Sequence, residues 1–380
     1  MSDERIDVMQ FDDWLKDDSD VAALVMRQWL EPVEGKDAVI FPPTYAKPER
    51  MRDEDWTGYN IDRFDDGSSV CQIDSVGSQA NRMEPIFKSD KYKHLVPQVV
   101  IKAGEREVHL LDAGHRAADA IVRFSDLADD LEDAFKAVKG GDAEKLAKIA
   151  PTSLVFGAWD SRATQVKLPR IVRSVIRAFK ATALHRSAQY IPAIEYVDAG
   201  LLDAPEGKQQ QDSMSQLGLS HAPAAWTHGG VLVEQEIRRD ASLNLVALRT
   251  LGVAPRQGGK PEATDKRVLG LRRYILGLSL VAFTAPQETF LREGCQLVPD
   301  TKRPAEWSLV RHDGQRDAKF NVSHEQVMGY AKSVADDFGV GSFRQATFNA
   351  KAAKEALGES KEERKKSRRG GTKRVQPETE

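Results

Sequence analysis

Apolar and charged side chains follow their most regular pattern between Ser153 and Arg186. Residues 153–159 form a short apolar run, which predicts a strand. Pro169 favours the first turn of a helix, and five apolar residues follow it at helical spacing: Ile171, Val172, Val175, Ile176 and Phe179. At about 100° per residue these five share one side, and the opposite side carries four cations: Arg170, Arg173, Arg177 and Lys180. The pattern predicts a strand that leads into a helix with one apolar and one basic face.

Shorter patterns predict elements on both sides of this segment. Three further strands are expected, at 69–75, 108–111 and 231–237, and a polar turn follows the first of them up to Pro85. Helical spacing predicts three more helices, at 117–138, 266–282 and 323–338. Gly140-Gly141 ends the first helix, and Ser323 with Gln326 forms a capping box at the start of the last. Strands mixed with helices and large insertions indicate the α+β class.

Composition along the chain predicts three parts. Residues 1–55 are acidic and contain several prolines, which indicates an N-terminal extension. Residues 56–350 carry the predicted elements and form the body, with a long polar insertion near 203–230. Residues 351–380 become basic and nearly lose apolar side chains, so we expect a tail that is disordered when free.

The overall composition is that of a soluble globular protein. The 380 residues are 41% hydrophobic and 30% charged, with a net charge of −3, and contain neither an apolar leader nor a run long enough to span a bilayer. We therefore expect a cytoplasmic protein without a membrane partner. Its two cysteines, Cys71 and Cys295, lack metal-ligand spacing and are expected to be reduced packing residues.

Net charge hides a local excess of cations. No Asp or Glu occurs between Asp160 and Glu195, so the basic face of the predicted helix has no acidic neighbours in sequence. Such a face is either solvated or a surface for phosphates. An exposed helix usually interleaves charges of both signs for pairing, so the missing acids favour phosphate binding.

Three segments resemble a known family. They read IDSVGSQANRMEP at 73–85, LLDAGHRAADAIVRFSD at 110–126 and SLVFGAWDSRATQVKLPRIVRSVIRA at 153–178. Each is similar to the corresponding segment of the CRISPR-associated RAMP-superfamily backbone subunit of type I-G Cascade, formerly type I-U, in the Cas-seven group. Weaker matches follow in the expected order, at 271–283 and 290–298.

This resemblance implies a fold and a function. The fold would be an RRM-like, ferredoxin-like palm with inserted thumb and finger elements. Copies of the subunit would polymerise along a CRISPR guide RNA and present it for pairing with target DNA, beside other Cascade subunits. The subunit would need no cofactor or metal, and a recruited helicase-nuclease would cleave the target. Such a scaffold contacts the RNA backbone because base pairing reads the sequence.

The candidate RNA-binding residues lie in two of the matching segments, except Lys180, which follows the third. In the predicted turn at 75–85, Gln79, Asn81 and Arg82 offer amides and a guanidinium to phosphate or 2′-OH groups, although an internally hydrogen-bonded turn explains the same residues. In the third segment, Arg162 and Lys167 flank the turn and join the cations at 170, 173, 177 and 180. Trp159 could stack on a base, but a Trp ending an apolar strand is more often a core residue.

Catalytic interpretations are weaker. His115 with Asp112 could form a base with its orienting partner or a metal site, but a capping Asp and a surface His are favoured, and His221 and His228 lack the support of a zinc site. A metal-dependent RAMP ribonuclease would need an acid such as Asp198, Asp203 or Asp212, and a monomeric RNA-processing factor would need no filament. No recognisable catalytic motif is present, so we expect a structural RNA-binding subunit rather than an enzyme.

Overall fold

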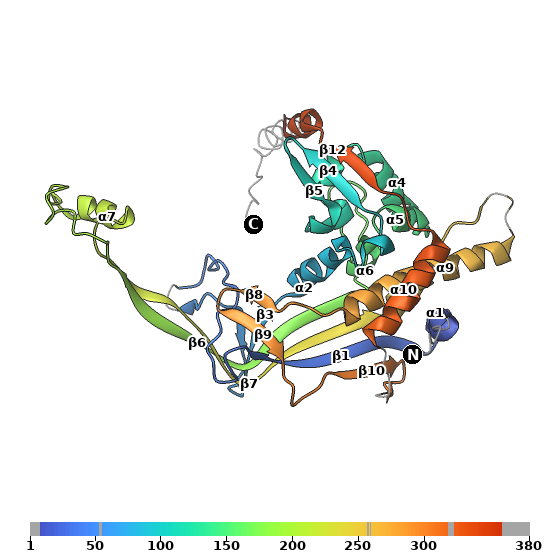
Figure 1. Ribbon diagram of the computed structural model, residues 1–380, viewed down its shortest axis with the longest axis horizontal. Coiled ribbons are helices and arrows are strands. Elements are labelled where there is room, and N and C mark those ends of the chain that lie inside the picture. The colour runs from blue at the N-terminus through green and yellow to red at the C-terminus, as the bar shows by residue number, and fades with distance from the viewer. Residues whose placement is uncertain (1–7, 53–54, 257, 259, 318–322, 359–380) are drawn as a thin grey trace, which may run out of the picture.

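The computed structural model describes residues 8–52, 55–256, 258, 260–317 and 323–358. A large sheet runs along the bottom of the molecule in Figure 1, with the order β11-β10-β1-β7-β6-β3-β2, and β9 pairs with both β1 and β8. All of its strand pairs are antiparallel. The strands are β1 (Val21–Pro32), β2 (Ile61–Arg63), β3 (Ser69–Asp74), β6 (Val172–Tyr190), β7 (Ala222–Asn244), β8 (Phe290–Arg292), β9 (Cys295–Pro299), β10 (Glu306–Arg311) and β11 (Arg316–Asp317).

Helices cover one face of this sheet (Figure 1). The longest are α9 (Pro261–Thr284) and α10 (His324–Phe338), and α2 (Val76–Met83) packs on β6. A smaller sheet, β12-β4-β5, lies above them and is built from β12 (Arg344–Thr347), β4 (Val99–Ala103) and β5 (Arg106–His109). The shorter helices of the body are α1 (Asp12–Leu15), α3 (Ala120–Arg123), α4 (Ala128–Lys139), α5 (Glu144–Ile149), α6 (Thr152–Phe156) and α8 (Leu245–Arg249). The α+β class is confirmed.

The main core lies between the large sheet and its helices. Helix α9 runs through this core and is buried on nearly every side from Tyr274 to Phe283, which explains its long apolar run. A second apolar cluster packs β8 and β9 against the sheet and contains both cysteines. Cys71 and Cys295 are free, buried thiols, as expected of packing residues, and burial raises the pKa of each to about 12.

The predicted basic helix after Pro169 is wrong, because Val172–Tyr190 forms strand β6. Ile171, Val172, Val175 and Ile176 are β-branched, which suits a pleated, half-buried strand. The strand predicted at 153–159 is also wrong, since Thr152–Phe156 is helix α6. The segment expected to be a strand is thus a helix, and the segment expected to be a helix is a strand.

Other elements agree more closely with the sequence pattern. The strands at 69–75 and 231–237 and the helices at 266–282 and 323–338 are confirmed, including the capping box of Ser323 and Gln326. The expected turn after Ser75 is instead helix α2, whose first turn is capped where the Ser78 amide donates to the Ser75 hydroxyl at 3.2 Å. The helix expected at 117–138 is divided into α3, which begins after a capping Asp119, and α4.

Strands β6 and β7 continue beyond the sheet as a two-stranded ribbon, seen at the left of Figure 1. Their pairing extends to Tyr190 and Ala222, and the tip between these residues carries helix α7 (Lys208–Gln216). The long loop expected at 203–230 is therefore mostly this helix and the start of β7. Bulges interrupt β6 where it leaves the sheet, and Lys180 occupies the first of them with a φ of 51°.

Both ends of the chain contribute to the fold. Within the segment expected as an N-terminal extension, β1 lies in the middle of the large sheet, between β7 and the strands β9 and β10. At the other end, residues 350–358 are helical, and the rest of the expected basic tail lies outside the described residues. No helix in the described ranges combines the length and the apolar character needed to cross a membrane.

Candidate nucleic-acid interface

A row of polar side chains crosses the open face of the large sheet. Alternate residues of β6 point to opposite faces: Ser174 points toward α2, whereas Arg173 and Arg177 point away from it. Strand register aligns Arg27 of β1 with Asp240 of β7 on one side and with Glu306 of β10 on the other. These residues therefore meet on one face although they are far apart in the sequence.

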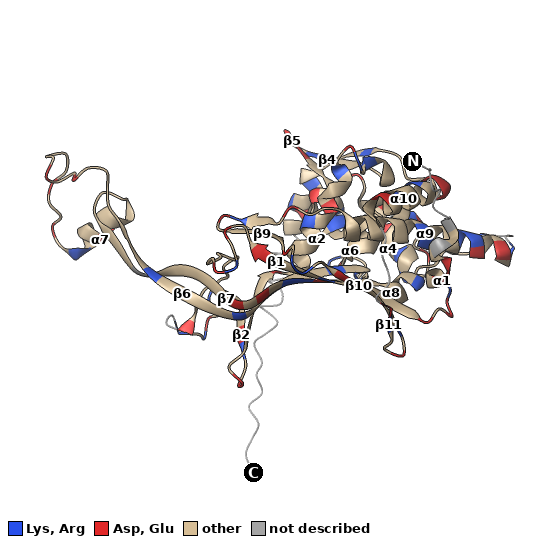
Figure 2. Cartoon of the chain, turned by 60° about the horizontal axis from the view of Figure 1, so that its bottom comes forward, with Lys and Arg blue, Asp and Glu red and all other residues tan. Residues whose placement is uncertain are grey.

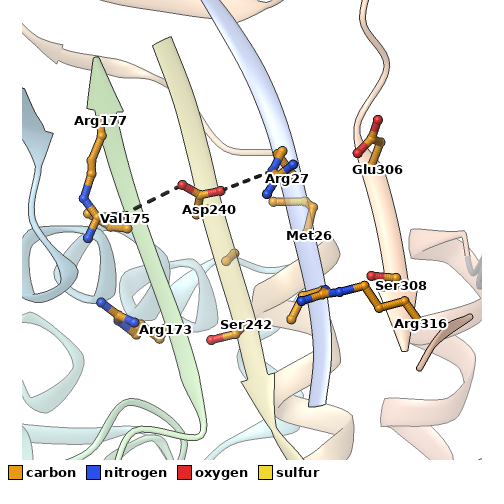
Figure 3. Close-up of a pocket in the computed structure, with 12 residues that line it drawn as sticks. Met26, Arg27, Arg173, Val175, Arg177, Asp240, Ser242, Glu306, Ser308 and Arg316 are labelled. Atoms are coloured by element: carbon orange, nitrogen blue, oxygen red, sulfur yellow. Dashed lines mark ion pairs between the residues drawn. The ribbon is translucent and has the colours of Figure 1, made fainter. Parts of the chain in front are cut away.

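Figure 3 shows the pocket that this row forms. It encloses about 450 Å³ and is lined by residues of five strands: Val25, Met26, Arg27, Arg173, Val175, Arg177, Asp240, Ala241, Ser242, Glu306, Ser308 and Arg316. Four arginines outnumber two carboxylates, so the pocket has a positive balance. Two serine hydroxyls and a guanidinium-rich wall suit phosphate and ribose groups.

Asp240 forms ion pairs with two arginines of this pocket. Its carboxylate lies 3.8 Å from Nε of Arg27 and 3.9 Å from Nη1 of Arg177 (Figure 3), and it accepts hydrogen bonds from Nε of Arg238 at 3.0 and 3.2 Å. Arg173 and Arg316 have no ion-pair partner within the described ranges. These two guanidinium groups are therefore the ones available to an anion.

A buried polar network lies on the other side of the sheet. Arg239 donates from Nε to the Ser174 hydroxyl at 2.9 Å, the hydroxyl donates to Oε1 of Gln79 at 2.7 Å, and Nε2 of Gln79 donates to Oδ2 of Asp74 at 2.6 Å. Burial lowers the pKa of Arg239 to about 10. Gln79 is only 1% exposed with both ends of its amide engaged, so the structure removes it from the candidate RNA contacts.

Asn81 and Arg82 are exposed but partly engaged. Nε of Arg82 lies 3.2 Å from Oδ2 of Asp74, and its Nη2 donates to the Leu291 carbonyl at 2.8 Å, which ties α2 to β3 and β8. Oδ1 of Asn81 accepts from Nη2 of Arg116 at 3.3 Å. Each side chain thus supports the fold and keeps only part of its hydrogen-bonding capacity for a ligand.

Arg116 links this helix to the segment before β6. Its Nε lies 2.7 Å from Oε2 of Glu84, and its Nη1 donates to the Gly157 carbonyl at 3.2 Å. Burial lowers the pKa of Arg116, and the positive charge of nearby Arg170 acts in the same direction. Arg170 is exposed and lies against Gly157, whose φ of 77° and close neighbours leave no room for a side chain.

A hairpin-like loop before β6 presents the other predicted cations. Trp159 and Lys167 face each other as a β-bridge, and Nζ of Lys167 lies 5.8 Å from the centroid of the Trp159 ring. Arg162 and Lys167 are exposed. Trp159 is 60% exposed, so the core role favoured by the sequence is wrong.

The predicted cations thus do not form one stripe. Arg173 and Arg177 line the open-face pocket, Arg162, Lys167 and Arg170 lie on or beside the loop, and Lys180 is exposed in a β-bulge. Sequence reasoning missed the partners of the pocket, namely Arg27, Arg316 and Asp240. Of these three residues, only Arg27 could have been noticed in the sequence, because it is a lone charged residue within the mostly apolar run VAALVMRQWL.

The described residues contain no group of three or more His, Cys, Asp or Glu side chains that could hold a metal ion. Asp198, Asp203 and Asp212 are exposed in the tip of the ribbon, and Asp112 pairs with Lys88 at 2.5 Å.

One family model matches this chain. It is described as CRISPR-associated protein GSU0053 and covers residues 24–183, less than half of the chain. No curated protein matches. The matched segment runs from β1 into β6 and contains Arg27, Arg173, Arg177 and the loop with Trp159. The match supports a CRISPR-associated protein.

Proposed function

We propose that this protein is the guide-RNA-binding backbone subunit of a type I CRISPR interference complex, of the type I-G Cascade kind that its sequence resembles. The observation that carries this proposal is the arginine-lined pocket on the open face of the sheet, where Arg173 and Arg316 have no ion-pair partner in the described chain. Cations and hydroxyls bind the phosphates and riboses of any sequence. The bases then stay free to pair with target DNA.

The strand order supports an RRM-like palm. The four strands β10-β1-β7-β6 lie side by side, with helices between β1 and β6, a hairpin between β6 and β7, and α9 between β7 and β10. This is the connectivity of a split βαβ unit of the ferredoxin-like type. The open face of its sheet is the face that carries the arginine pocket.

The ribbon supports assembly of several copies. It projects from the sheet (Figures 1 and 2), and its tip exposes apolar side chains that include Ile191 at 62%, Leu201 at 61% and Leu217 at 74%. An arm that docks on a different surface of the next copy makes a heterologous contact, which repeats along a filament. We propose that the ribbon is the thumb that contacts the neighbouring copy or the guide.

Assembly on RNA tests the proposal. The purified chain is mixed with guide RNAs of increasing length, and the mass of each complex is measured by analytical ultracentrifugation. We expect the mass to rise in steps of one 42.2 kDa subunit as the RNA lengthens. A single bound copy on every RNA would instead indicate a monomeric RNA-processing factor.

A double variant, Arg173→Ala with Arg316→Ala, tests the pocket itself. It should weaken binding to all RNA sequences and reduce the salt slope by about one for each lost phosphate contact. The matched control is Arg344→Ala on the smaller sheet, whose guanidinium is already paired with Asp130 at 2.7 Å. An equal effect of both variants would contradict the assignment of the pocket.

We further propose that the chain is a scaffold and not a nuclease. Incubation of the complex with guide and target strands in Mg²⁺ or Mn²⁺ should leave all strands intact. Cleavage that is lost in Asp198→Ala would establish the metal-dependent ribonuclease alternative.

A further inference from the structure

The loop between α6 and β6 holds a large aromatic side chain in solvent. Trp159 is 60% exposed, whereas Trp14 is buried and Trp29, Trp56 and Trp307 are partly buried. A ligand that covers so large an apolar ring removes apolar surface from water, which is favourable.

This loop is firmly anchored beneath the exposed ring. Ala158, Val166 and Leu168 are buried in the main core, and the Leu168 amide donates to the Ala158 carbonyl at 2.7 Å. Oδ2 of Asp160 accepts from the Thr164 amide at 2.8 Å and from its hydroxyl at 2.7 Å. These bonds do not involve the indole, so the loop presents Trp159 in a fixed position without depending on its side chain.

The exposed charges of this loop have one sign. Arg162 and Lys167 are exposed on the same loop, and its only acid, Asp160, is buried and engaged in the bonds to Thr164. A pocket of about 350 Å³ adjoins the loop and is lined by Lys139 and Lys167 together with the backbone around Gly141 and Gly252. The chemistry next to the indole therefore favours an anionic ligand.

An unpaired nucleotide combines the two features that this loop accommodates. Its base has a flat face that stacks on an aromatic ring, and its phosphates are neutralised by nearby cations. Base–aromatic stacking tolerates every base, which suits a protein that binds guides of different sequence. The arginine pocket on the sheet lacks an exposed aromatic ring among its lining residues and contacts the backbone instead.

We propose that Trp159 is a stacking platform for one unpaired base of the bound RNA, with Lys167 and Arg162 contacting the adjoining phosphates. The inference rests on the proposed function and adds a base contact to an otherwise backbone-binding subunit.

Binding of two RNA probes to the full chain tests this inference. The first is a labelled oligoadenylate, and the second is the same chain with abasic positions. We expect Trp159→Ala to weaken binding of oligoadenylate by about 5- to 150-fold and to leave binding of the abasic RNA unchanged. Trp159→Phe should restore most of the affinity. The salt slope should stay constant in both Trp159 variants and decrease by about one in Lys167→Ala.

Phe64→Ala is the matched control, because Phe64 is 52% exposed on another loop whose neighbours Asp65 and Asp66 are acidic. It should bind both RNAs like the wild type. An equal loss on both RNAs in Trp159→Ala, or no loss on either, would overturn the stacking role while leaving the proposed function intact. Altered self-association without RNA in Trp159→Ala would show that the ring docks on protein and would also overturn it. A wild-type chain that binds neither RNA would overturn the proposed function as well.

Discussion

Glu84 and Arg116 form an ion pair inside the protein, with 2.7 Å between Oε2 and Nε, and the two residues are 1% and 4% exposed. Burial raises the pKa of Glu84 to about 7, against the opposing effect of the Arg116 charge. Arg116 is also close to two of the predicted RNA contacts, because it donates a hydrogen bond to Asn81 and lies near Arg170. The buried ion pair therefore lies next to two of the candidate RNA-binding residues.

The raised pKa of Glu84 predicts that the stability of the fold depends on pH. The folded-state pKa of Glu84 lies above the ordinary glutamate pKa of 4.5, so the stability that its protonated form contributes is fully present below about pH 4.5 and is lost as pH rises through about 7. Relative to Glu84→Gln, the wild type should lose up to about 3 kcal/mol of unfolding free energy between these limits and then level off. Urea unfolding of both proteins at pH 5 and pH 8 measures this difference. If the wild type instead became more stable relative to Glu84→Gln between pH 5 and pH 8, the raised pKa would be contradicted.

Replacement of Gln79 should destabilise the fold and spare RNA binding. Gln79→Ala removes the link between Ser174 and Asp74 and leaves buried polar atoms without partners, which costs about 1–3 kcal/mol. Urea unfolding gives the stability, and RNA affinity is measured where the variant is fully folded. Ser78→Ala, at a partly exposed position of the same helix whose hydroxyl has no hydrogen-bond partner among the described residues, is the control for stability. Weaker RNA binding with unchanged stability would restore Gln79 as an RNA contact.

Removal of the central carboxylate from the pocket should strengthen RNA binding. Asp240→Asn releases Arg27, Arg177 and Arg238 from a competing anion, so affinity should rise several-fold at low salt with a steeper salt slope. The stability cost should not exceed about 1 kcal/mol per pair, because these groups are partly exposed. Asp130→Asn on the other side of the molecule should change neither quantity. A lower affinity in Asp240→Asn would mean that Asp240 aligns the arginines for the ligand.

Shortening the ribbon should separate folding from assembly. Tyr190 and Ala222 are the last paired residues, so residues 191–221 can be replaced by an Asn-Gly turn that joins them directly. The melting temperature should stay nearly constant, because the tip packs on neither core cluster. Stepwise growth on guide RNA, followed by ultracentrifugation, should be lost. Normal growth would show that the tip is dispensable for contacts between copies.

The sequence predicted helices α9 and α10 better than the strand β6 that lines the candidate site. Helices α9 and α10 follow from long apolar runs and a capping box, which are local signals. Strand β6 was mistaken for a helix because Arg173 and Arg177, four residues apart, share a face in both structures. The β-branched residues around them favour a strand, whereas Pro169 and the helical spacing of the apolar residues favour a helix.

The arginine pocket depends on contacts between distant segments. Arg27, Asp240 and Arg316 enter it from three strands, and only the register of the sheet brings them beside Arg173. No local pattern encodes that register. The exposure of Trp159 likewise follows from the replacement of a strand by α6 and a hairpin-like loop, which turns the ring outward.

The outer part of the β6–β7 ribbon borders no third strand, and this isolation makes its length adjustable. Two residues added to each strand would lengthen the arm by about 7 Å and keep every side chain on its face, whereas a single added residue would exchange the two faces. The sheet and its arginine pocket would be undisturbed in either case. The arm can therefore change its reach in increments of two residues per strand; under the proposed function, this would alter the spacing of successive copies and leave the proposed guide-binding surface unchanged.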